Sequence, residues 1–532
     1  MEYHIHIFLL KDNNQNHIIN LYKQFQEDCI QQLSGEESFV LYNDKTQSYF
    51  AVRDIIGLRP LYYTFVGKQF YFSNNIETLF RKSGISKKPN LKTMQNIVYH
   101  STIAYDETMY QDIKRLPPGH YMTIDKTGKH TIKRYWKPEE IKINNKITEQ
   151  EAKERFLMLL DQAIFDRIDD LATTGFELSG GLDSSSIVSW VKHRKPQENV
   201  TAFSMYFTSM EACDESEYID AMEEKYQLNL QKLATDQMDY KSRYSLENNY
   251  RLNPCWPIFI TYTMGFSVVE RAKELKIKTI LTGQGGDHIL AGNLYVLDEY
   301  FRTFQWLQLY KEVRALPNWK RFIKAYLVAP LIGEKNIQIL RSFYHKIKRR
   351  KSLKKIPEID FKELSDFYSG HSVSFKYDLE QVLHSTFSAL MDSSYYTVAE
   401  EHFGIVFRHP FFDRRLIEFM LTLPPKFKYS EGLSKRLLRK AMEGVLPEKI
   451  RQRTDKAEFS EVLRQQIDAI DLDDLFHDAN LARLGLVDQE KLDRYKEDYI
   501  SGKMKSVVYF WQLINLEYWY RFNFVNGHNL DR

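Results

Sequence analysis

The feature that most constrains the fold is the run Ser-Gly-Gly-Leu-Asp-Ser-Ser-Ser at positions 179–186. It lies between a short strand-like stretch, 176–178, and an apolar stretch typical of a helix, 187–191. Paired glycines let backbone N–H groups approach a phosphate, the hydroxyls add donors, and a helix N-terminus favours negative charge. A glycine turn with a serine cap needs only one hydroxyl and no paired glycines. The run therefore predicts a pyrophosphate-binding loop at the end of a strand.

The start of the expected helix distinguishes this loop from the phosphate loop that serves cleavage at a γ-phosphate. That loop carries a lysine after its glycines, whereas Asp183 stands at the helix start here. A triphosphate would repel this aspartate unless a Mg²⁺ ion lay between them. The sequence therefore predicts that Asp183 binds magnesium.

A second loop of the same kind follows a later apolar stretch. Residues 280–287 read Ile-Leu-Thr-Gly-Gln-Gly-Gly-Asp, again a strand that ends in glycines and then an acid. A nucleotide site in an open α/β sheet is built from several strand ends, so we expect both loops to face one ligand. Asp287 would then share with Asp183 the Mg²⁺ on the departing pyrophosphate.

The sequence pattern changes near residue 140. Earlier residues read as short β-runs broken by turns, and from about 150 helical patterns alternate with apolar strands at 201–207 and 278–282. That alternation predicts a parallel sheet flanked by helices. After residue 294 strand signals fade, and helices are expected to dominate to the end. The polar segment 137–146 is the predicted linker between domains at 1–140 and 147–532. The early β-runs are expected at 38–42, 48–52, 61–66, 69–73 and 120–125.

Charge and cysteine content argue against several classes of protein. The 532 residues carry a formal net charge of +3, which argues against a dedicated nucleic-acid binder. Cys29, Cys213 and Cys255 are far apart, so neither a zinc site nor a disulfide framework is indicated, and a reducing cytoplasm fits. The apolar run at the N-terminus is too short to span a membrane, and no basic segment precedes it. We therefore expect neither a signal peptide nor a membrane span.

Three further features have simple structural interpretations. His4 and His6 alternate with isoleucines, which suits the surface face of an edge strand better than a metal pair. Lysine and arginine crowd residues 341–355, where a solvated face is the default and a docking surface for an acidic peptide or protein is the alternative. Most aromatic rings of residues 507–522 are expected in the core, and some could line a substrate chamber.

Further segments carry a resemblance to a known family. They are Arg-Asp-Ile-Ile-Gly-Leu-Arg-Pro-Leu-Tyr-Tyr at 53–63, Leu-Pro-Pro-Gly-His at 116–120, Arg-His-Pro-Phe-Phe-Asp at 408–413 and Arg-Thr-Asp-Lys-Ala-Glu-Phe at 453–459. With the two loops they resemble the asparagine synthetase and β-lactam synthetase family, most of all its lasso-peptide cyclases, which form isopeptide bonds. This implies an α/β protein with a shortened class II glutamine amidotransferase-like α+β domain. An asparagine synthetase-like adenine nucleotide α-hydrolase (PP-loop) domain, with a parallel sheet and a helical C-terminal part, would follow it.

The resemblance also implies a reaction and its cofactors, ATP and Mg²⁺. A substrate carboxylate attacks the α-phosphate, giving an acyl-adenylate and pyrophosphate, and an amine then displaces AMP to form an amide. Lys456 is implied to stabilise charge on the α-phosphate or the tetrahedral oxyanion, although its surroundings in the sequence also suit a surface lysine. Asp183 and Asp287 are the implied magnesium ligands. The implied nucleotide contacts are Leu178, Met205, Thr282 and Gly283 at the adenosine, and Ser179, Gly180, Gly181 and Ser184 at the phosphates.

The N-terminal domain departs from the family in its glutamine-handling residues. Glutamine-using members expose a cysteine at the mature N-terminus, whereas Glu2 follows Met1 here and the first cysteine is Cys29. Only about forty residues precede the segment that begins at residue 39, and the Asn-Gly-Glu stretch that helps bind glutamine is missing. We expect a remnant without glutaminase activity, retained for structure or for binding a partner.

The second loop departs from the family as well. Gln284 occupies a position where asparagine synthetase carries a glutamate, and an amide cannot accept the proton of ammonia. His288 replaces a usual acidic residue, and Val406 stands where an acid often precedes the Arg-x-Pro-Phe segment. An attacking amine must still lose a proton, so a general base is expected. The candidates are His288, which is equally suited to a cap or packing role, Glu400, Glu401 and Glu458.

These departures favour ring closure within one substrate. Without a glutaminase, the nitrogen comes from an amine on the substrate or from free ammonia. The long, partly basic segment 295–385 suits a precursor peptide, whose N-terminal amine would join an Asp or Glu side chain in a macrolactam. A leader peptidase or leader-binding protein is a further expected partner. The alternatives are an ammonia-dependent asparagine synthetase, a small-molecule cyclase similar to β-lactam synthetase, a tRNA-modifying pyrophosphatase and a non-catalytic binding protein.

Overall fold

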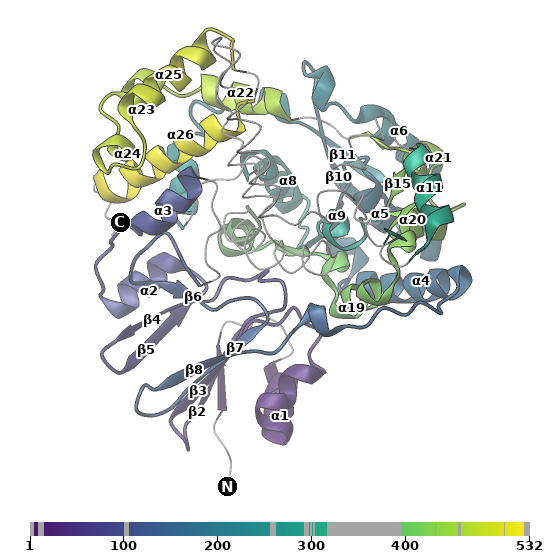
Figure 1. Ribbon diagram of the computed structural model, residues 1–532, viewed down its shortest axis with the longest axis horizontal. Helices are drawn as coiled ribbons and strands as arrows, with labels where there is room; N and C mark the ends of the chain where they lie inside the picture. The colour runs from purple at the N-terminus through teal and green to yellow at the C-terminus, as the bar shows by residue number, and fades with distance from the viewer. Residues whose placement is uncertain are drawn as a thin grey trace.

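The computed structural model shows an N-terminal domain of two antiparallel sheets and a larger domain built around a parallel sheet (Figure 1). This confirms the predicted α/β fold class, with an α+β domain followed by a domain built on a parallel sheet. The predicted linker includes a short 3-10 turn, η2 (Pro138–Glu140). The structure describes residues 5–8, 15–99, 106–255, 262–291, 297, 300–301, 304–315, 395–430, 432–455, 459–504 and 506–525. Residues 341–355 and His4 lie outside these ranges, as do the side chains of the first strand.

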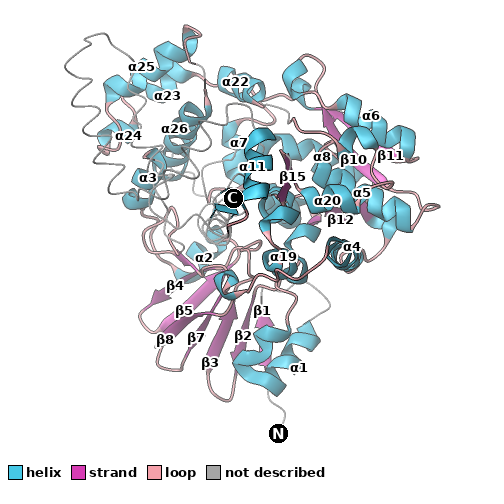
Figure 2. Ribbon diagram, turned by 45° about the vertical axis from the view of Figure 1, so that its right-hand side comes forward, coloured by secondary structure: helices cyan, strands magenta, loops and turns pink. Residues whose placement is uncertain are grey.

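The N-terminal domain is a sandwich of two sheets (Figure 2). Successive residues of a strand point to opposite faces, so each strand of the larger sheet buries two sets of apolar side chains. Phe39 and Leu41 face one helical layer, whereas Val40 packs against the second sheet. In order, the larger sheet contains β1 (Ile5–Phe8), β2 (Phe39–Asn43), β3 (Ser48–Val52), β7 (His120–Ile124) and β8 (His130–Arg134), and the smaller one β5 (Gln69–Ser73), β4 (Tyr62–Val66) and β6 (Lys114–Arg115). Its helices are α1 (Gln15–Phe25), η1 (Gln26–Gln32), α2 (Ile76–Ser83) and α3 (Leu91–Val98).

The second domain contains a five-stranded sheet in which every neighbouring pair is parallel. Its strands, in spatial order, are β11 (Asn229–Ala234), β10 (Thr201–Tyr206), β9 (Thr174–Glu177), β12 (Thr279–Leu281) and β13 (Val406–Arg408). Both faces of this sheet are covered. Phe176 and Leu281 belong to the apolar cluster on one face, whereas Phe203 and Ile280 belong to the cluster on the other. The strand interiors are therefore apolar runs, as burial on two faces requires.

Helices form the two layers around this sheet. The largest stabilising contribution comes from burial of their apolar faces, at roughly 25 cal/mol per Å² of apolar surface. The helices that share the apolar cluster on one face are α4 (Glu149–Phe165), α5 (Leu182–Arg194), α6 (Ser216–Lys225), α19 (Arg414–Thr422), α20 (Arg436–Ala441) and α21 (Glu448–Arg451). On the other side are α7 (Leu246–Leu252), α8 (Tyr262–Glu274), α18 (Tyr395–Val398) and a π-helical turn, η8 (Ala399–Phe403). Two short elements, α9 (Gly286–Ile289) and α11 (Trp306–Ala315), lie between these in the sequence.

The C-terminal helices pack onto both domains. They are α22 (Ser460–Asp468), α23 (Leu472–Phe476), α24 (Asn480–Arg483), α25 (Gln489–Ile500) and α26 (Val508–Tyr520). The last of them, α26, is buried on nearly all sides and lies beside α3 of the N-terminal domain (Figure 1). Tyr509 of α26 donates a hydrogen bond to the Val98 carbonyl oxygen at 3.1 Å. The prediction that the rings of 507–522 belong to the core is confirmed, and this core spans the two domains.

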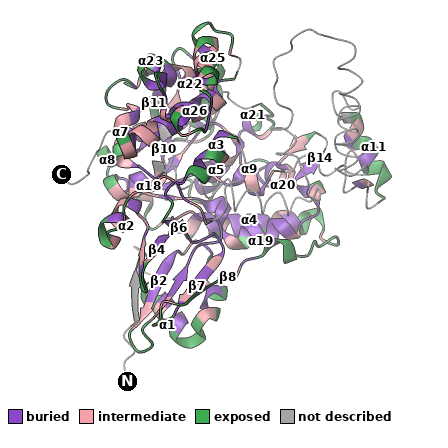
Figure 3. Cartoon of the chain, turned by 60° about the vertical axis from the view of Figure 1, so that its left-hand side comes forward, coloured by how far each residue is buried: buried purple, intermediate pink, exposed green. Residues whose placement is uncertain are grey.

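Helices dominate the described residues after 294, as expected, but three short strands also occur there. β13 extends the parallel sheet, and a small antiparallel pair, β14 (Tyr429–Ser430) and β15 (Leu433–Ser434), follows it. Runs of two or three residues carry no periodic signal, so tertiary pairing decides their conformation. Buried residues gather in strands such as β2 and β7, whereas α11 and α25 carry exposed faces (Figure 3). Within the described residues, no helix combines the length and the apolar composition that a transmembrane segment needs.

Candidate functional site

The two glycine-rich loops lie side by side at one edge of the parallel sheet. The first follows β9, the second follows β12, and these strands are neighbours in the sheet. From β9 the chain continues to β10 on one side, and β12 lies on the other, so the strand order reverses between β9 and β12. In open α/β sheets, ligands bind beyond the carboxyl ends of the strands at this reversal point. The fold thus places both loops where a ligand site is expected.

The first loop is held in shape by its own serines. The Ser179 N–H donates to Ser184 Oγ at 3.2 Å, and the two serine hydroxyls lie 3.0 Å apart. Gly180 has a positive φ of 72°, and a Cβ atom added there would lie 2.8 Å from Cβ of Tyr218. Gly181 caps α5, so its backbone and that of the next residues face outward from the helix N-terminus. The result is a compact turn that presents N–H groups and hydroxyls, as an anion requires.

The second loop packs directly on the first. A Cβ atom added at Gly283 would lie 2.5 Å from the backbone nitrogen of Ser184. One added at Gly286 would lie 2.2 Å from Cγ of Asp183. Both distances are shorter than any side chain tolerates, so only glycine permits this approach. The glycines read from the sequence therefore have a second function, because they bring the two loops into contact.

Asp183 and Asp287 converge on a single lysine. Lys435 Nζ lies 2.6 Å from Asp183 Oδ2 and 2.6 Å from Asp287 Oδ1. The two carboxylates are therefore separated by no more than about twice that distance. Lys435 sits at the start of α20 with a left-handed backbone, φ 58°, which is uncommon outside glycine. Its side chain is 9% exposed, against 15% for Asp183 and 48% for Asp287.

The charges at this point suit a cation and a phosphate together. Burial alone would lower the pKa of Lys435, but Asp183 and Asp287 raise it above its ordinary value, so the ammonium stays charged. Among the described residues, no group of three or more His, Cys, Asp and Glu side chains gathers as a metal site. Mg²⁺ usually takes one or two protein carboxylates and completes its shell with phosphate and water. The donor set of Asp183 and Asp287 therefore fits Mg²⁺ held together with a triphosphate.

The residues expected at the adenosine lie along the same edge. Leu178 follows β9, is buried and donates its N–H to the Phe203 carbonyl at 2.8 Å. Met205 lies near the end of β10, and Thr282 follows β12 as a buried residue. Three neighbouring strands thus contribute one residue each, next to the first loop. Their contact with adenosine remains a prediction.

Lys456 lies outside the described residues, so its role also remains a prediction. The residues just before it lie against the first loop. Arg453 donates to the Gly180 carbonyl oxygen at 3.2 Å and forms an ion pair with Glu215 at 2.6 Å. The Arg453 guanidinium also lies 3.9 Å above the ring of Tyr218. The chain that leads into Lys456 is therefore anchored on the turn of the first loop.

The proposed bases differ in their surroundings. Glu400 Oε1 accepts a hydrogen bond from Arg59 at 3.2 Å, and Glu401 accepts one from Asn75 at 3.0 Å. Both carboxylates thus contact the N-terminal domain. His288 is half-buried in α9, directly after Asp287. Glu458 lies outside the described residues.

Sequence reasoning missed two side chains of this site, Lys435 and His409. Lys435 is one of several basic residues in its stretch of sequence, and no local pattern marks it. His409 is buried, and its Nδ1 lies 2.7 Å from Thr282 Oγ1. The resemblance included His409 within a longer segment but gave it no role. Neither contact is visible without the fold, because each joins residues more than a hundred positions apart.

Burial of His409 makes the stability of the protein dependent on pH. Burial, with Arg167 and Arg59 nearby, lowers its pKa from an ordinary 6.5 to about 3. The folded protein keeps this imidazole neutral, whereas the unfolded chain protonates it below about pH 6.5. The unfolding free energy contributed by His409 is thus lost as pH falls from 6.5 towards 3. At pH 5 we expect the loss to be about 2 kcal/mol relative to pH 8.

Urea unfolding at pH 8 and pH 5 checks this expectation. In a His409→Gln variant, the difference between the two pH values should be about 2 kcal/mol smaller than in the unmodified protein. His193, an exposed histidine on α5, provides the control, and its replacement by glutamine should leave the difference unchanged. An equal pH dependence in the His409→Gln variant would contradict the assignment.

Comparison with known proteins agrees with this architecture. Residues 155–521 match the family model of asparagine synthase, and residues 11–136 match that of a glutamine amidotransferase domain. Asparagine synthetase [glutamine-hydrolyzing] 1 of Bacillus subtilis is 23% identical over 541 residues, covering 95% of this chain and 82% of the relative. Asparagine synthetase [glutamine-hydrolyzing] 3 of the same organism is 23% identical over 539 residues, covering 93% and 79%.

Proteins with other names share part of the chain. A Penicillium rubens protein named amidase chyE is 25% identical over 295 residues, covering 52% of this chain and 42% of its own length. The asparagine synthase model covers more than half of the chain, including both glycine-rich loops and Lys435. The chain therefore belongs to the asparagine synthase family.

Proposed function

We propose that this protein adenylates a carboxylate with ATP and converts it to an amide, closing a macrolactam ring in a ribosomal precursor peptide. Membership of the family implies an ATP-dependent ligase. The observation that carries the adenylation proposal is the convergence of Asp183 and Asp287 on Lys435, at the strand-order reversal of the sheet. In the ring-closing step, the N-terminal amine of the peptide joins an Asp or Glu side chain of the same peptide.

In the first step, the substrate carboxylate attacks the α-phosphate of ATP. A carboxylate–phosphorus bond forms, and the bond to pyrophosphate breaks. The loop residues Ser179, Gly180, Gly181 and Ser184 bind phosphate oxygens at the N-terminus of α5. Asp183 and Asp287 would hold Mg²⁺, which would supply positive charge for the pyrophosphate. Lys435 adds a positive charge where the two loops meet.

In the second step, the amine attacks the activated acyl carbon and AMP leaves with the electron pair of the carbon–oxygen bond. The amine gives up one proton, which a base must receive. Lys456 is the proposed cation at the charge that develops in both steps. One ATP and one peptide thus give AMP, pyrophosphate and a cyclic product that is lighter than the peptide by one water.

The source of the nitrogen distinguishes this proposal from glutamine-dependent synthesis. All three cysteines of the sequence are buried and form no disulfide bond, and burial raises the pKa of the Cys29 thiol to about 12. A thiol in that state is not a nucleophile at neutral pH. We therefore propose that the N-terminal domain, residues 1–140, has no glutaminase activity beside the adenylating domain, residues 147–532. Cysteines that form no disulfide also suit the reducing cytoplasm that we propose as its location.

An ammonia-dependent asparagine synthetase is the second candidate. It is favoured by the two Bacillus relatives, which carry the name asparagine synthetase and align along almost the whole chain. Gln284 argues against it, because the amide side chain in the second loop cannot take the proton of ammonium. The two candidates share the adenylation step and differ in the acceptor.

Pyrophosphate release with ATP and Mg²⁺ separates the candidates. We expect release to depend on a precursor peptide, and the peptide product to lose one water by mass spectrometry. The arms without peptide contain aspartate with ammonia, aspartate with glutamine, and small amino-acid derivatives. The glutamine arm should yield no glutamate. Peptides encoded beside the gene, with Gly or Ala first and an acid seven to nine positions later, are the first to test.

The outcomes of this screen are distinct. Turnover with aspartate and ammonia, and with no peptide, would replace the cyclase proposal by the asparagine synthetase. Release of phosphate or ADP, rather than pyrophosphate and AMP, would overturn the adenylation step itself. If only a small amino-acid derivative loses water, the protein is a small-molecule cyclase.

A further inference from the structure

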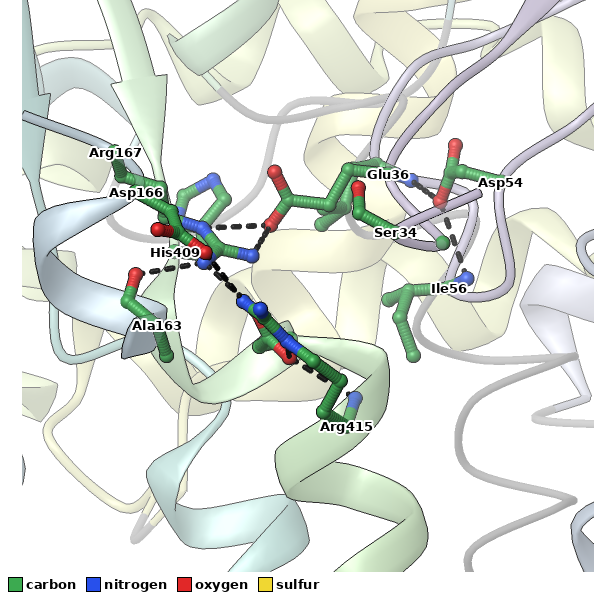
Figure 4. A network of polar contacts seen from close by, with 12 residues as sticks. Ser34, Glu36, Asp54, Ile56, Ala163, Asp166, Arg167, His409 and Arg415 are labelled. Carbon is green, nitrogen blue, oxygen red and sulfur yellow. Dashed lines mark hydrogen bonds and ion pairs between the residues drawn. The ribbon is translucent and has the colours of Figure 1, made fainter. Parts of the chain in front are cut away.

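The two domains are joined by a cluster of charged side chains around the buried Arg167 and Asp413. Arg167, just after α4, donates from Nε to Glu36 Oε1 at 2.9 Å, and one of its terminal nitrogens pairs with the same oxygen. Glu36 belongs to the N-terminal domain, in the turn between η1 and β2. Figure 4 shows this pair; the Arg167 side chain is 4% exposed and that of Glu36 25%, so the guanidinium is buried and the carboxylate half-buried. A buried charged group that loses its partner is costly, so the pair strongly favours one arrangement.

Arg167 uses its remaining donors on the synthetase-like domain. Its NH1 group donates to Asp413 Oδ2 at 3.0 Å and to the Ala163 carbonyl oxygen at 2.6 Å. Asp413 is buried and caps α19 by accepting the Arg415 N–H. Burial alone would raise the pKa of Asp413, but Arg415 and Arg167 lower it below its ordinary value. Arg167 thus contacts both Glu36 of the N-terminal domain and Asp413 at the start of α19.

Residues 409–413, which end at Asp413, pack against the second loop, and we call them the support segment. His409, four residues earlier, bonds to Thr282 Oγ1 at 2.7 Å through Nδ1. The ring of Phe412 lies so close to Gly285 that a Cβ atom there would be 2.8 Å from it. Residues 409–413 therefore contact both ends of the turn between β12 and α9. A displacement of Asp413 would be transmitted to that turn, because packed cores do not deform continuously.

The turn that carries Glu36 is itself rigid and close to α19. The backbone N–H groups of Gly35 and Glu36 donate to the Glu37 carboxylate at 2.9 and 3.0 Å. Gly35 has a positive φ of 96°, and a Cβ atom there would lie 2.9 Å from Cβ of Arg414. The turn thus lies directly against α19 at Arg414 and is also linked to Asp413, the cap of α19, through Arg167, so Glu36 is held in a fixed position relative to α19.

From this path of contacts we propose that Glu36 is a positioning residue through which the N-terminal domain fixes the second nucleotide loop. The order of contacts is Glu36, Arg167, Asp413, the support segment 409–413 and the turn 282–287. The inference rests on the proposed nucleotide site. It gives the N-terminal domain a function that needs no glutaminase chemistry, namely to hold the synthetase-like site in its binding geometry.

The direct test is ATP affinity in the full-length protein. Glu36→Gln keeps the shape of the side chain and removes its charge, so the hold on Arg167 weakens. We expect the Kd for MgATP, measured by calorimetry well below the melting temperature, to rise about tenfold. Glu27→Gln is the matched control, because Glu27 is a carboxylate of the same domain that bonds to Tyr121 within that domain. Its Kd should equal that of the unmodified protein.

A second measurement needs no nucleotide. Hydrogen exchange in Glu36→Gln should quicken in peptides that cover 282–290 and 409–413, and not in the buried strand β10. If the Glu36–Arg167 pair were purely structural, Glu36→Gln would lower the melting temperature and quicken exchange throughout, with the Kd unchanged. That result would overturn the positioning role. Absence of ATP binding in the unmodified protein would refute the nucleotide site itself. In that case, unchanged exchange in the second loop would separately refute the role of Glu36.

Discussion

Replacing Asp183 with asparagine is expected to slow pyrophosphate release by a factor on the order of 100 or more, because charge stabilisation in a shielded site has effects of this size. Asp183 is only 15% exposed and faces Lys435 and the second loop. Asparagine has nearly the same shape and still accepts a hydrogen bond from Lys435 Nζ. The protein should therefore fold, while the negative charge offered to Mg²⁺ is halved at the meeting point of the loops.

Initial rates over a range of Mg²⁺ concentrations provide the measurement. The concentration that gives half-maximal rate should rise in Asp183→Asn, and again in Asp287→Asn, whose carboxylate meets the same ammonium. Asp220→Asn is the matched control, because Asp220 is a surface aspartate that pairs with Lys232 at 2.9 Å. Rates that remain within about twofold of the unmodified protein in both loop variants would remove these aspartates from the site.

The placement of the loops could be predicted from the sequence because it depends on local signals and on a general rule. Paired glycines after apolar runs mark strand ends, and parallel strands present those ends at a common edge. β10 begins at Thr201, as expected, and β12 begins at Thr279, within one residue of its predicted start. The contact between Gly283 and Ser184 then follows from the two strands being neighbours.

Lys435 could not be predicted, for a physical reason. It pairs with Asp183 across 252 positions, and it has a left-handed backbone at the start of α20 that no local sequence signal marks. Charge patterns in sequence identify solvated basic residues, and a buried lysine looks the same as these until its partners are placed. β13 was missed on similar grounds, since three residues hold no period from which a strand could be read.

The packing of the two domains against each other could not be predicted from local sequence signals either. Periodicity predicts that α26 has apolar residues, but not that Val98 of the N-terminal domain would face them. Likewise, Glu36 reads as an ordinary surface acid beside Glu37 until Arg167 is brought to it. The sequence therefore predicted two domains correctly and understated how far they share a core and a charge cluster.

Replacing Gly283 with alanine is expected to slow pyrophosphate release by roughly a hundredfold, the loss that a misplacement of about 1 Å can cause in a site. The added Cβ would lie 2.5 Å from the Ser184 nitrogen and 2.9 Å from its Cα. These are backbone atoms in the first turn of α5, so no side chain can rotate away to relieve the clash. The two loops must separate instead, at a cost of roughly 1–3 kcal/mol in stability.

A second glycine separates this steric effect from the general cost of alanine. At Gly444, a Cβ atom meets open space, but φ is +78°, so Gly444→Ala strains the backbone and should lower the melting temperature. Its rate of pyrophosphate release should nevertheless stay within about twofold of the unmodified protein, because Gly444 is not part of either loop. Gly283→Ala should lose about as much stability as Gly444→Ala, but far more of its rate of pyrophosphate release. If both variants lose rate only in proportion to their stability, the close packing of the two loops is not what the reaction requires.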